Sequence, residues 1–475
     1  MVDQITVQFI DSNGATQSIQ DWSEYNIQRD FFDPADGFTL VCEDDRADQL
    51  NSLMQVGQRL LFNLNNFTIL VGYIDTMEYS YTRGGHGKML IIRGRDICGI
   101  LGDAVVYPNL GLGGTTDYQF NPDTTLSQAM NGIFLNGLTT ITSLLTNGNG
   151  FNLAPLSNST LGSQTAGQAF GTGIKSKAKT GRGISSSYQS NLKRLCKPEK
   201  EETYLHYASR LAKHAGAFIK CMPGSDAALF VGTPNYNTSN VPYSLQHYYQ
   251  TEMRFNSNPV NANNIHDGKL RVSYKDQPSV IIGEATHGQA NFRKQTTKVI
   301  CINEFTGYIQ GTTSLTIDNA IPNVKNAVEQ LTTGSVGATN QNGYYLLAAN
   351  NDLYTAADQN VIGVQTNFSR PYYYIDHNAQ TVEELMIGVA ELMATFQDKF
   401  FDLEYVVDQH SNNGYPWGIN QMCSVADDTF GPPNKSLNGQ YWIQKVNFIK
   451  SRSEGTQTVL TLRLPFTHVV NFTST

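Results

Sequence analysis

The chain has 475 residues, about three times the usual domain size, so two to four domains are expected and a single small fold is excluded. Charged residues make up only 16% and hydrophobic residues 40%, which excludes a wholly disordered chain and favours β-rich structure with a polar rather than ionic surface. The formal net charge is −8, yet residues 1–50 alone hold eleven acidic and two basic side chains, so the acidity is concentrated in the N-terminal module.

The first hundred residues show short β-strand patterns separated by turn residues. Apolar residues alternate over positions 5–9 and precede an Asp-Ser-Asn-Gly turn at positions 11–14. Further strands are predicted at Phe38–Cys42, Arg59–Leu64, Phe67–Asp75 and Lys88–Arg93. Asn65 and Asn66 suit a hairpin turn because asparagine tolerates positive φ. Strands at this spacing predict a first small, tube-like β-barrel over residues 1–108.

Residues 109–190 have a different character. An interrupted helix is predicted over 125–145, where apolar residues have near-helical spacing, followed by a Gly- and Ser-rich insertion. Seven basic and no acidic side chains lie between Lys175 and Lys197, which predicts a mobile basic loop. The loop is either a solvated segment or a docking element for an acidic partner surface or nucleic acid. Its candidate docking residues are Lys175, Lys177, Lys179 and Arg182.

Residues 191–255 are predicted to form a helix-hairpin α/β module. The helix covers Glu201–Ala215 and ends at Gly216, because glycine is the usual residue just past a helix end. The hairpin strands are predicted at Phe218–Lys220 and Ala228–Val231. Taken with the barrel before it, this module predicts a mixed, β-rich α+β fold.

A second, discontinuous tube-like barrel is predicted from residues 256–290 and 400–475. Its strands are expected at Lys269–Tyr274, Ser279–Gly283, Gln421–Val425, Tyr441–Phe448 and Gln457–Leu464. Residues 291–399 form an insertion that ends in an amphipathic helix packing on the barrel. Thr381 and Glu384 stand in capping-box positions at the start of that helix.

No residue pattern supports catalysis, a cofactor or a metal ion. Gly171–Ser176 lacks the spacing of a phosphate loop, and His206 and His214 are too far apart on one helix to share a metal. Neighbouring carboxylates do not make a glycosidase pair, so we interpret them as solvated surface charge. These carboxylates are Glu383, Glu384, Asp427 and Asp428.

The cysteines and the hydropathy pattern also exclude several classes of protein. The six cysteines are scattered without a CxxC pair, so we expect buried reduced thiols rather than a zinc site or a disulfide framework. No stretch approaches the roughly 18 apolar residues of a membrane-spanning helix, and the N-terminus has no signal-peptide pattern. We therefore expect a soluble protein with no membrane span.

Three groups of motifs follow one another along the chain. The first comprises Gly37–Leu40, Val56–Leu60, Leu70–Asp75, Ile92–Asp96 and Leu101–Asp103. The second comprises Glu202-Thr203, Arg210–Ala212 and Gly216. The third comprises Asp376, the helix from Thr381, Gly414–Trp417, Val425–Asp427, Tyr441–Ile443 and the strand that ends at Pro465. Their order resembles the baseplate hub proteins of contractile-tailed bacteriophages of the phage Mu and P2 type, which are related to the T-even phage hub and to the hub part of secretion-system spike proteins.

The resemblance implies a homotrimer in which each subunit supplies two similar barrels. Such a ring adapts the six-fold tail tube to the three-fold central spike and forms part of the DNA ejection channel. The implied partners are the central spike, tail tube or tube-initiator proteins, the tape measure protein and wedge proteins, with DNA passing through without sequence-specific binding. The implied location is the tail baseplate of the virion, after assembly in the host cytoplasm. The acidic first module predicts an acidic lumen, because an acidic channel wall repels the phosphates of DNA and lets the DNA slide through.

Eight residues of the resembling motifs are predicted to have structural or interface roles. They are Gly72, Tyr73, Asp75, Gly94, Arg95, Asp96, Trp417 and Trp442. The two glycines are expected where strands bend or approach closely, and the two tryptophans in the core of the second barrel. Arg95 and Asp96 are expected to tie the last strand either to a neighbouring element or to the next subunit.

Two other classes of function stay open from the sequence alone. One is a tail-associated cell-wall hydrolase built on carboxylates, and the other is a receptor-binding tail protein that uses the polar, Asn- and Tyr-rich loops. A spike-hub fusion of a secretion system is disfavoured, because no long C-terminal β-helical repeat is present. Residues 105–190 and 291–366 depart from the family pattern, so no partner contact is assigned to them.

Overall fold

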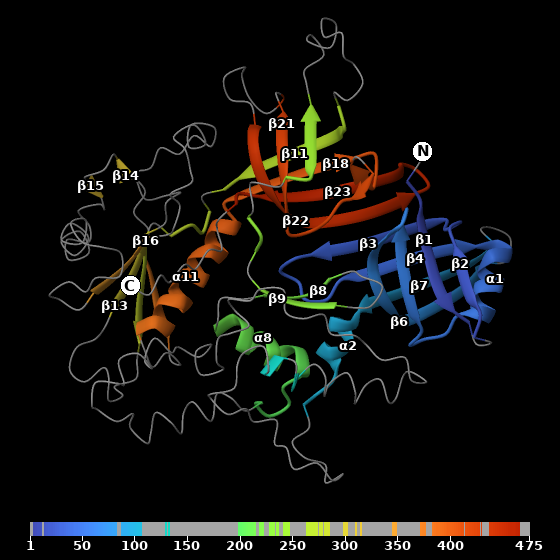
Figure 1. Ribbon diagram of the computed structural model, residues 1–475, viewed down its shortest axis with the longest axis horizontal. Helices are drawn as coiled ribbons and strands as arrows, with labels where there is room; N and C mark the ends of the chain where they lie inside the picture. Colours follow the sequence, from blue (N-terminus) through green and yellow to red (C-terminus); the bar gives the residue numbers. More distant parts are fainter. Residues whose placement is uncertain are drawn as a thin grey trace, which may run out of the picture.

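The computed structural model is β-rich and elongated, with few helices (Figure 1). It describes residues 3–11, 14–82, 87–106, 129–130, 132–133, 198–214, 218–222, 228–232, 234–236, 241–247, 263–273, 275–278, 280–285, 298–302, 309–310, 314–315, 344–348, 371–376, 382–412, 414–427, 429 and 437–465. Thirteen of the described strands form one sheet, along whose main path the order is β11-β18-β23-β22-β3-β4-β7-β6-β5-β1-β2. The predicted β-rich α+β character is therefore confirmed.

The first lobe, as we name it, contains the strands of the N-terminal hundred residues and two short helices. Its elements are β1 (Ile5–Ile10), β2 (Thr16–Ile19), β3 (Glu24–Asp30), β4 (Gly37–Glu43), α1 (Asp44–Leu53), β5 (Arg59–Leu64), β6 (Phe67–Thr82), β7 (Gly87–Asp96) and α2 (Ile97–Asp103). Its strands alternate buried and solvent-facing residues, as in β4 and β5, because one face packs on the core. Asn65, at the predicted β5–β6 hairpin, has a φ of 55°.

The second lobe contains the strands that continue the same sheet from the other half of the chain. Its strands are β10 (Tyr243–His247), β11 (Ile265–Val272), β18 (Phe401–Val407), β21 (Gln421–Asp427), β22 (Leu437–Ser451) and β23 (Gly455–Arg463). β21 and β10 branch from the main path, since β21 pairs with β22 and β10 pairs with β21. One hydrophobic core, which contains Val7 and Leu40 as well as Leu403 and Leu460, runs through both lobes.

The strand order of the first lobe recurs in the second lobe. β3-β4-β7-β6-β5-β1 corresponds to β11-β18-β23-β22-β21-β10, and each corresponding pair has the same sense except the last, which is antiparallel in the first lobe and parallel in the second. The β6–β7 register shifts between Ile74 and Thr76, and the β22–β23 register shifts between Ile443 and Lys445. Counting from these bulges, Gly87 corresponds to Gly455, and both begin the return strand with positive φ. The chain therefore contains an internal structural duplication.

The two lobes join where β3 pairs with the second half of β22. Residues 445–450 of β22 lie antiparallel to residues 25–30 of β3, while residues 437–443 pair with β21. Figure 1 shows β22 and β3 side by side at this junction. The long β22 strand thus holds both lobes in one sheet.

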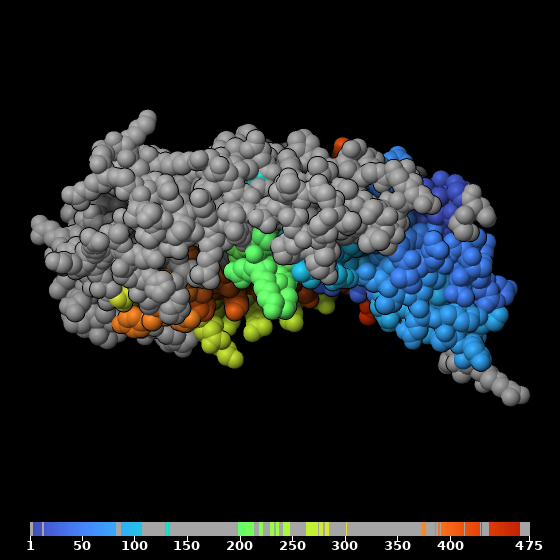
Figure 2. Space-filling view, turned by 90° about the horizontal axis from the view of Figure 1, so that it is seen from below, coloured from blue at the N-terminus to red at the C-terminus, as the bar shows by residue number. Residues whose placement is uncertain are grey.

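A smaller sheet and a helix lie at the opposite end of the molecule from the first lobe (Figures 1 and 2). The sheet consists of β12 (Val280–Ala285), β13 (Lys298–Ile302), β16 (Tyr344–Ala348) and β17 (Pro371–Asp376), and α11 (Val382–Asp398) packs on it. Short strand pairs are β14 (Ile309–Gln310) with β15 (Ser314–Leu315) and β19 (Ser411–Asn412) with β20 (Tyr415–Pro416). Leu385, Val389 and Met393 bury the helix against Ile281, as the predicted apolar stripe requires.

The predicted helix-hairpin module packs against α2 at the end of the first lobe. It consists of α8 (Tyr204–His214) and the hairpin of β8 (Phe218–Met222) and β9 (Ala228–Gly232), which share a core with α2. The helix and hairpin predictions are confirmed. In Figure 2, α8 (green) lies between the first lobe and the α11 end of the molecule.

Some sequence predictions fall on residues that the structure does not describe, and two predicted domain assignments are wrong. The interrupted helix over 125–145 lies largely outside the described residues, as does the basic loop around Lys175, Lys177, Lys179 and Arg182. The strand pairing places β12 in the smaller sheet and β10 in the second lobe, whereas the sequence places them in the second barrel and in the helix-hairpin module. The closure of either lobe into a barrel stays a prediction.

Candidate functional site

Six of the eight predicted site residues lie together where β6 crosses β7. Gly72 is opposite Asp96, Tyr73 is opposite Arg95, and Ile74 is opposite Gly94 in the strand register. Asp75 occupies the bulge that follows. The motif residues of the first lobe therefore form one local structure.

The two glycines at this crossing make room for one aromatic ring. A Cβ atom on Gly72 would lie 2.5 Å from Cε1 of Phe38, and a Cβ atom on Gly94 would lie 2.5 Å from Cζ of the same ring. A Cβ atom on Gly94 would also collide with the carbonyl oxygen of Tyr73. The predicted close approach of strands is thus confirmed, and the buried Phe38 side chain is its cause.

Arg95 links the bulge of β6 to the end of α2. Its Nε lies 2.7 Å from Oδ2 of Asp75, and its guanidinium also binds both carboxylate oxygens of Asp103. These hydrogen bonds raise the pKa of Arg95, Asp103 contributing most and Asp75 next. Of the two alternatives for Arg95, the structure shows the contact to a neighbouring element.

Asp96 ties the end of β7 to the start of α2 and to the β3–β4 turn. Its side chain accepts hydrogen bonds from the backbone N–H groups of Cys98 and Gly99, at 2.9 and 3.3 Å, and so caps the start of α2. It also accepts a 3.1 Å hydrogen bond from the backbone N–H of Asp36. Burial, followed by the nearby Asp36 carboxylate, raises the pKa of Asp96 to about 7.

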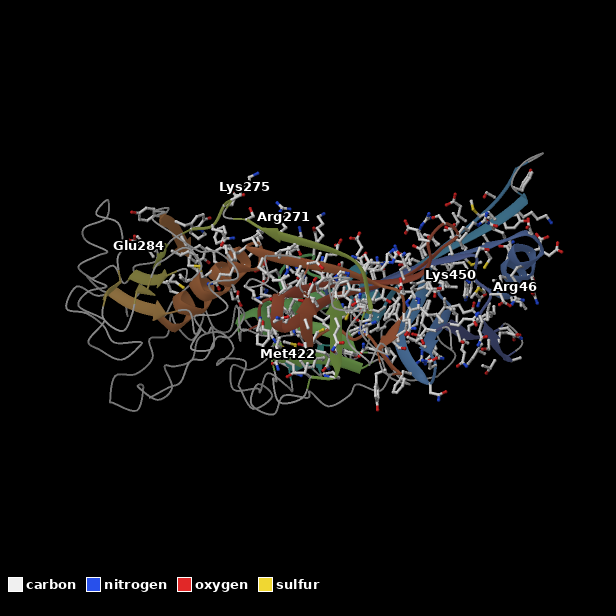
Figure 3. The ribbon with its side chains drawn as sticks, turned by 90° about the horizontal axis from the view of Figure 1, so that it is seen from above. Arg46, Arg271, Lys275, Glu284, Met422 and Lys450 are labelled. Carbon is white, nitrogen blue, oxygen red and sulfur yellow. The ribbon has the colours of Figure 1, made fainter. Side chains whose placement is uncertain are left out.

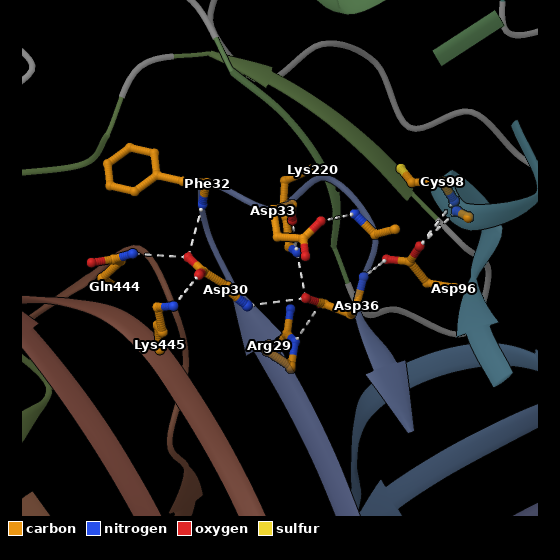
Figure 4. Close-up of polar contacts among 12 residues, drawn as sticks. Arg29, Asp30, Phe32, Asp33, Asp36, Asp96, Cys98, Lys220, Gln444 and Lys445 are labelled. Carbon is orange, nitrogen blue, oxygen red and sulfur yellow. Dashed lines mark hydrogen bonds and ion pairs between the residues drawn. The ribbon is translucent and has the colours of Figure 1, made fainter. Parts of the chain in front are cut away.

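A buried cluster of charges continues from Asp36 into the helix-hairpin module (Figure 4). The Asp36 carboxylate lies 3.1 Å from Nε of Arg29 and binds Nζ of Lys220 at the other oxygen. Nζ of Lys220 also donates to the carbonyl oxygen of Asp33, at 2.6 Å. The side chains of Lys220 and Asp36 are fully buried, so each charge depends on the other for its stabilisation.

The same β3–β4 turn also connects to β22. The Asp30 carboxylate accepts a 3.1 Å hydrogen bond from Gln444 and lies 2.7 Å from Nζ of Lys445 (Figure 4). Gln444 in turn accepts a 2.7 Å hydrogen bond from Nε of Arg463. By the duplication, Gln444 and Arg463 correspond to Asp75 and Arg95, so the contact between the bulge and the return strand recurs.

The two predicted tryptophans are fully buried in different clusters. Trp417 packs on Tyr243 with ring centroids 4.9 Å apart and lies in the main core. Trp442 packs edge-on against Phe31 at 5.2 Å, in a small aromatic cluster at the junction of the lobes. Trp442 corresponds to Tyr73 in the first lobe. Both tryptophans are buried, as expected of core residues, but Trp442 lies in the cluster at the junction of the lobes and not in the main core.

An ion pair holds the helix-hairpin module together at the second motif. Glu202 and Arg210 form a bidentate pair with two contacts of 2.9 Å, and Glu202 is buried. The backbone N–H of Tyr204 donates to the carbonyl oxygen of Ala104, which joins α8 to the chain after α2. The Glu-Thr and Arg-Leu-Ala motif residues thus have a structural basis.

The described residues offer no arrangement for metal chemistry. No group of three or more His, Cys, Asp or Glu side chains in the described part of the chain could hold a metal ion. Asp427 is buried and accepts hydrogen bonds from Tyr405 at 2.7 Å and from the backbone of Thr429 at 2.8 Å. It therefore differs from the solvated surface charge expected of it. The side chains of Glu383, Glu384 and Asp428 lie outside the description.

Five cysteines in the described part of the chain are buried, as predicted, and Cys196 lies outside it. Among the described residues, no helix is long and apolar enough to cross a bilayer.

Comparison with known families identifies the first lobe. Residues 10–96, from the end of β1 to the Asp96 cap, match the family described as Mu phage baseplate assembly protein GpP-like, N-terminal. This segment is therefore similar to a GpP-like baseplate domain, and we call it the GpP-like domain. All six site residues of the β6–β7 crossing lie inside it.

Two solved structures resemble the whole chain, including the parts outside the GpP-like domain. One is the tail protein from Neisseria meningitidis MC58, with a TM-score of 0.57, 16% identity, and coverage of 98% of this chain and 99% of that one. The other is the 43 kDa tail protein of prophage MuSo2 from Shewanella oneidensis, with a TM-score of 0.57, 15% identity, and coverage of 98% and 100%. At these identities the likeness concerns the fold. A search of curated proteins finds no match.

Sequence reasoning missed the residues that attach the helix-hairpin module to the GpP-like domain. Asp36 and Lys220 are separated by 184 residues, and no local pattern relates them. One signal was available, since a lysine inside the otherwise apolar strand Phe218–Met222 needs a buried partner. The partner itself could be found only from the fold.

Proposed function

We propose that this chain is a structural hub subunit of a contractile phage tail baseplate, without catalysis of its own. Three copies would form a ring that adapts the six-fold tail tube to the three-fold central spike. The bore of the ring would form part of the DNA ejection channel. The GpP-like domain and the shared fold with two phage tail proteins support this proposal.

The internal duplication is the observation that carries the proposal. Two lobes with the same strand order lie side by side in one sheet, so three chains supply six similar lobes. A ring of this kind presents a near six-fold face to a tube while it keeps three-fold symmetry for a trimeric spike. A chain with one lobe would need six copies to do the same.

The partners follow from this place in the tail. We propose contacts with the central spike, with tail tube or tube-initiator proteins, with the tape measure protein and with wedge proteins. We propose the first and second lobes as the two tube-like barrels, with α8, β8 and β9 as the helix-hairpin module. We propose residues 109–190 and the chain between β11 and β18, which includes β12, as insertions. An acidic lumen, assembly in the host cytoplasm and passage of DNA without sequence-specific binding belong to the same proposal.

Negative-stain imaging of the full chain tests the proposal. The protein is imaged at high concentration, alone and with its candidate spike, and scored for symmetry and for a central hole. Three-fold rings with six similar lobes around a hole are expected. Compact monomers under both conditions would contradict the hub function. A peptidoglycan zymogram is expected to show no clearing.

A further inference from the structure

Several strand edges of the large sheet have no strand partner among the described residues, and two of them, on β11 and on the second half of β6, correspond to strands that pair elsewhere in the chain. β11 pairs only with β18, and the second half of β6, residues 76–82, pairs only with β7. β5 pairs with β6 only over residues 67–73. Exposed strand edges of this kind are ready to pair with another chain.

The internal duplication relates each of these two edges to a strand of the other lobe. β11 corresponds to β3, and residues 76–82 of β6 correspond to residues 445–451 of β22. Within the chain, β3 and that half of β22 are the two strands that pair with each other to join the lobes. The two unpartnered edges are therefore the two halves of a second, equivalent junction.

We propose that residues 76–81 of β6 in one copy of the chain pair antiparallel with residues 268–273 of β11 in another copy. The inference rests on the ring of the proposed function and specifies the contact between its subunits. Transfer of the β22–β3 register, in which Val446 is opposite Arg29, gives the pairs. They are Thr76 with Ser273, Met77 with Val272, Glu78 with Arg271, Tyr79 with Leu270, Ser80 with Lys269 and Tyr81 with Gly268.

One face of the proposed strand pair is apolar, and the pairing would bury side chains that are exposed in the single chain. Tyr79, Tyr81 and Val272 are 37%, 78% and 36% exposed. At the equivalent in-chain junction, Phe448 and Ile27, which correspond to Tyr79 and Leu270, are fully buried. The proposed pairing would cover the exposed residues, and the Tyr81 ring would lie over Gly268, a favourable arrangement for a glycine in a strand.

The other face of the proposed pair is charged and complementary. Glu78 would lie opposite Arg271, and Ser80 opposite Lys269. In the single chain Glu78 forms an ion pair of 3.3 Å with the exposed Arg93 of β7. Figure 3 shows the side chain of Arg271 projecting away from the ribbon, on the same side as Lys275. Opposite charges directly across an antiparallel pair stabilise it, and like charges destabilise it.

The contact is heterologous, because β6 of one copy meets β11 of the next. Each chain then has one donor edge and one acceptor edge, and repetition gives a ring if the rotation closes. In that ring the in-chain β3–β22 junction alternates with the between-chain β11–β6 junction. This alternation makes the spacing of the lobes nearly uniform around the ring.

Charge reversal at the central polar pair tests the inference. The oligomeric state of the full chain is measured by sedimentation velocity over a concentration series for the native protein, Glu78→Arg, Arg271→Glu and the double variant. Each single reversal is expected to weaken association by about tenfold or more per interface, because it places two like charges opposite each other. The double variant is expected to recover association, since it restores the pair with inverted signs.

Matched reversals at exposed residues outside the proposed register serve as controls. Glu454→Arg, at the tip of the β22–β23 hairpin, and Lys275→Glu, beyond the end of β11, are expected to leave association unchanged. Rings that persist in both single variants, or a double variant that stays dissociated, would overturn this interface while leaving the hub proposal intact. A native protein that stays monomeric, alone and with its candidate spike, would overturn both.

Discussion

The two lobes share a backbone plan and fill it with different side chains. In the first lobe Gly72 and Gly94 flank the ring of Phe38. The corresponding positions of the second lobe hold Tyr441 and Leu462, and the smaller Leu403 stands at the position of Phe38. The register and the bulge are the same in both lobes. The large side chain is on β4 in the first lobe, whereas the second lobe has large side chains on β22 and β23, which correspond to β6 and β7. The comparison teaches that the plan depends on the total volume at the crossing, not on which strand supplies it.

The lobes also differ in how their first two strands are connected. In the first lobe residues 31–36 join β3 to β4 directly, and Asp36 in that turn holds the buried charge cluster. In the second lobe residues 273–400 join β11 to β18 and carry the smaller sheet and α11. The same position in the plan therefore serves as an anchor in one lobe and as an insertion site in the other.

The largest effect is expected from a variant that breaks the buried ion pair between Asp36 and Lys220, which only the first lobe has. Lys220→Met removes a fully buried cation and leaves the Asp36 carboxylate with the Arg29 guanidinium and the backbone N–H of Asp30. Removal of one partner from a buried ion pair costs about 3–5 kcal/mol. We expect a loss of this size in the free energy of unfolding of the first lobe, measured by urea denaturation. Arg93→Met is the matched control, because it removes an exposed pair worth less than about 1 kcal/mol.

A pH dependence is expected at a contact that the lobes make differently. In the second lobe the buried His410 ring lies 2.7 Å from the hydroxyls of both Tyr25 and Thr458 and packs on Phe448. In the first lobe the residue corresponding to Phe448 is Tyr79, which instead donates to the exposed Asp48. Burial lowers the pKa of His410 to about 4.

Because His410 is neutral when folded and binds a proton more readily when unfolded, its contribution to stability is lost as the pH falls from about 6.5 to 4. The loss reaches about 3 kcal/mol at the lower end. Urea denaturation at several pH values gives the free energy of unfolding of the native protein and of His410→Gln. The difference between the two at each pH cancels the titration of all other groups. Parallel pH profiles would contradict the role of the buried imidazole.

The smallest expected effect sharpens the volume argument. Gly72→Ala places a methyl group against the Phe38 ring and is expected to cost about 1–3 kcal/mol. Phe38→Leu, which imitates Leu403 of the second lobe, is expected to relieve part of that cost in the double variant. The same rescue is expected to fail for Gly94→Ala, because its methyl group also meets the backbone oxygen of Tyr73. Equal rescue of both glycine variants would refute the argument.

Elements with a strong local pattern could be predicted from the sequence. β5 matches its predicted bounds, and α11 follows the predicted apolar stripe. The helix α1 was missed because only Ala47 and Leu50 are buried on it, so its sequence has almost no apolar periodicity. β17 was missed because Tyr372, Tyr373 and Ile375 are exposed on an edge strand and do not alternate with polar residues.

The candidate site could be predicted only in part. The β6–β7 residues were found because they are close in sequence and form a recognisable motif. The buried cluster and the lobe junction depend on contacts across 184 and more than 400 residues, for which a single sequence contains no periodicity. Two similar barrels were expected only from the family resemblance. Which residues correspond could not be predicted, because corresponding residues such as Gly72 and Tyr441 differ greatly in size.

The β3–β22 junction has a consequence for the synthesis of the chain. Residues 30 and 445, which pair there, are separated by nearly the whole polypeptide. At about 5–20 residues per second, the ribosome delivers β22 roughly 20–80 s after β3. During that interval the first lobe can fold, but its β3 edge remains an open template for other strands. Nascent chains on one polysome hold their open β3 edges close together, so slow translation favours aggregation. Rapid translation, or a chaperone bound to the β3 edge, favours the correct pairing with β22.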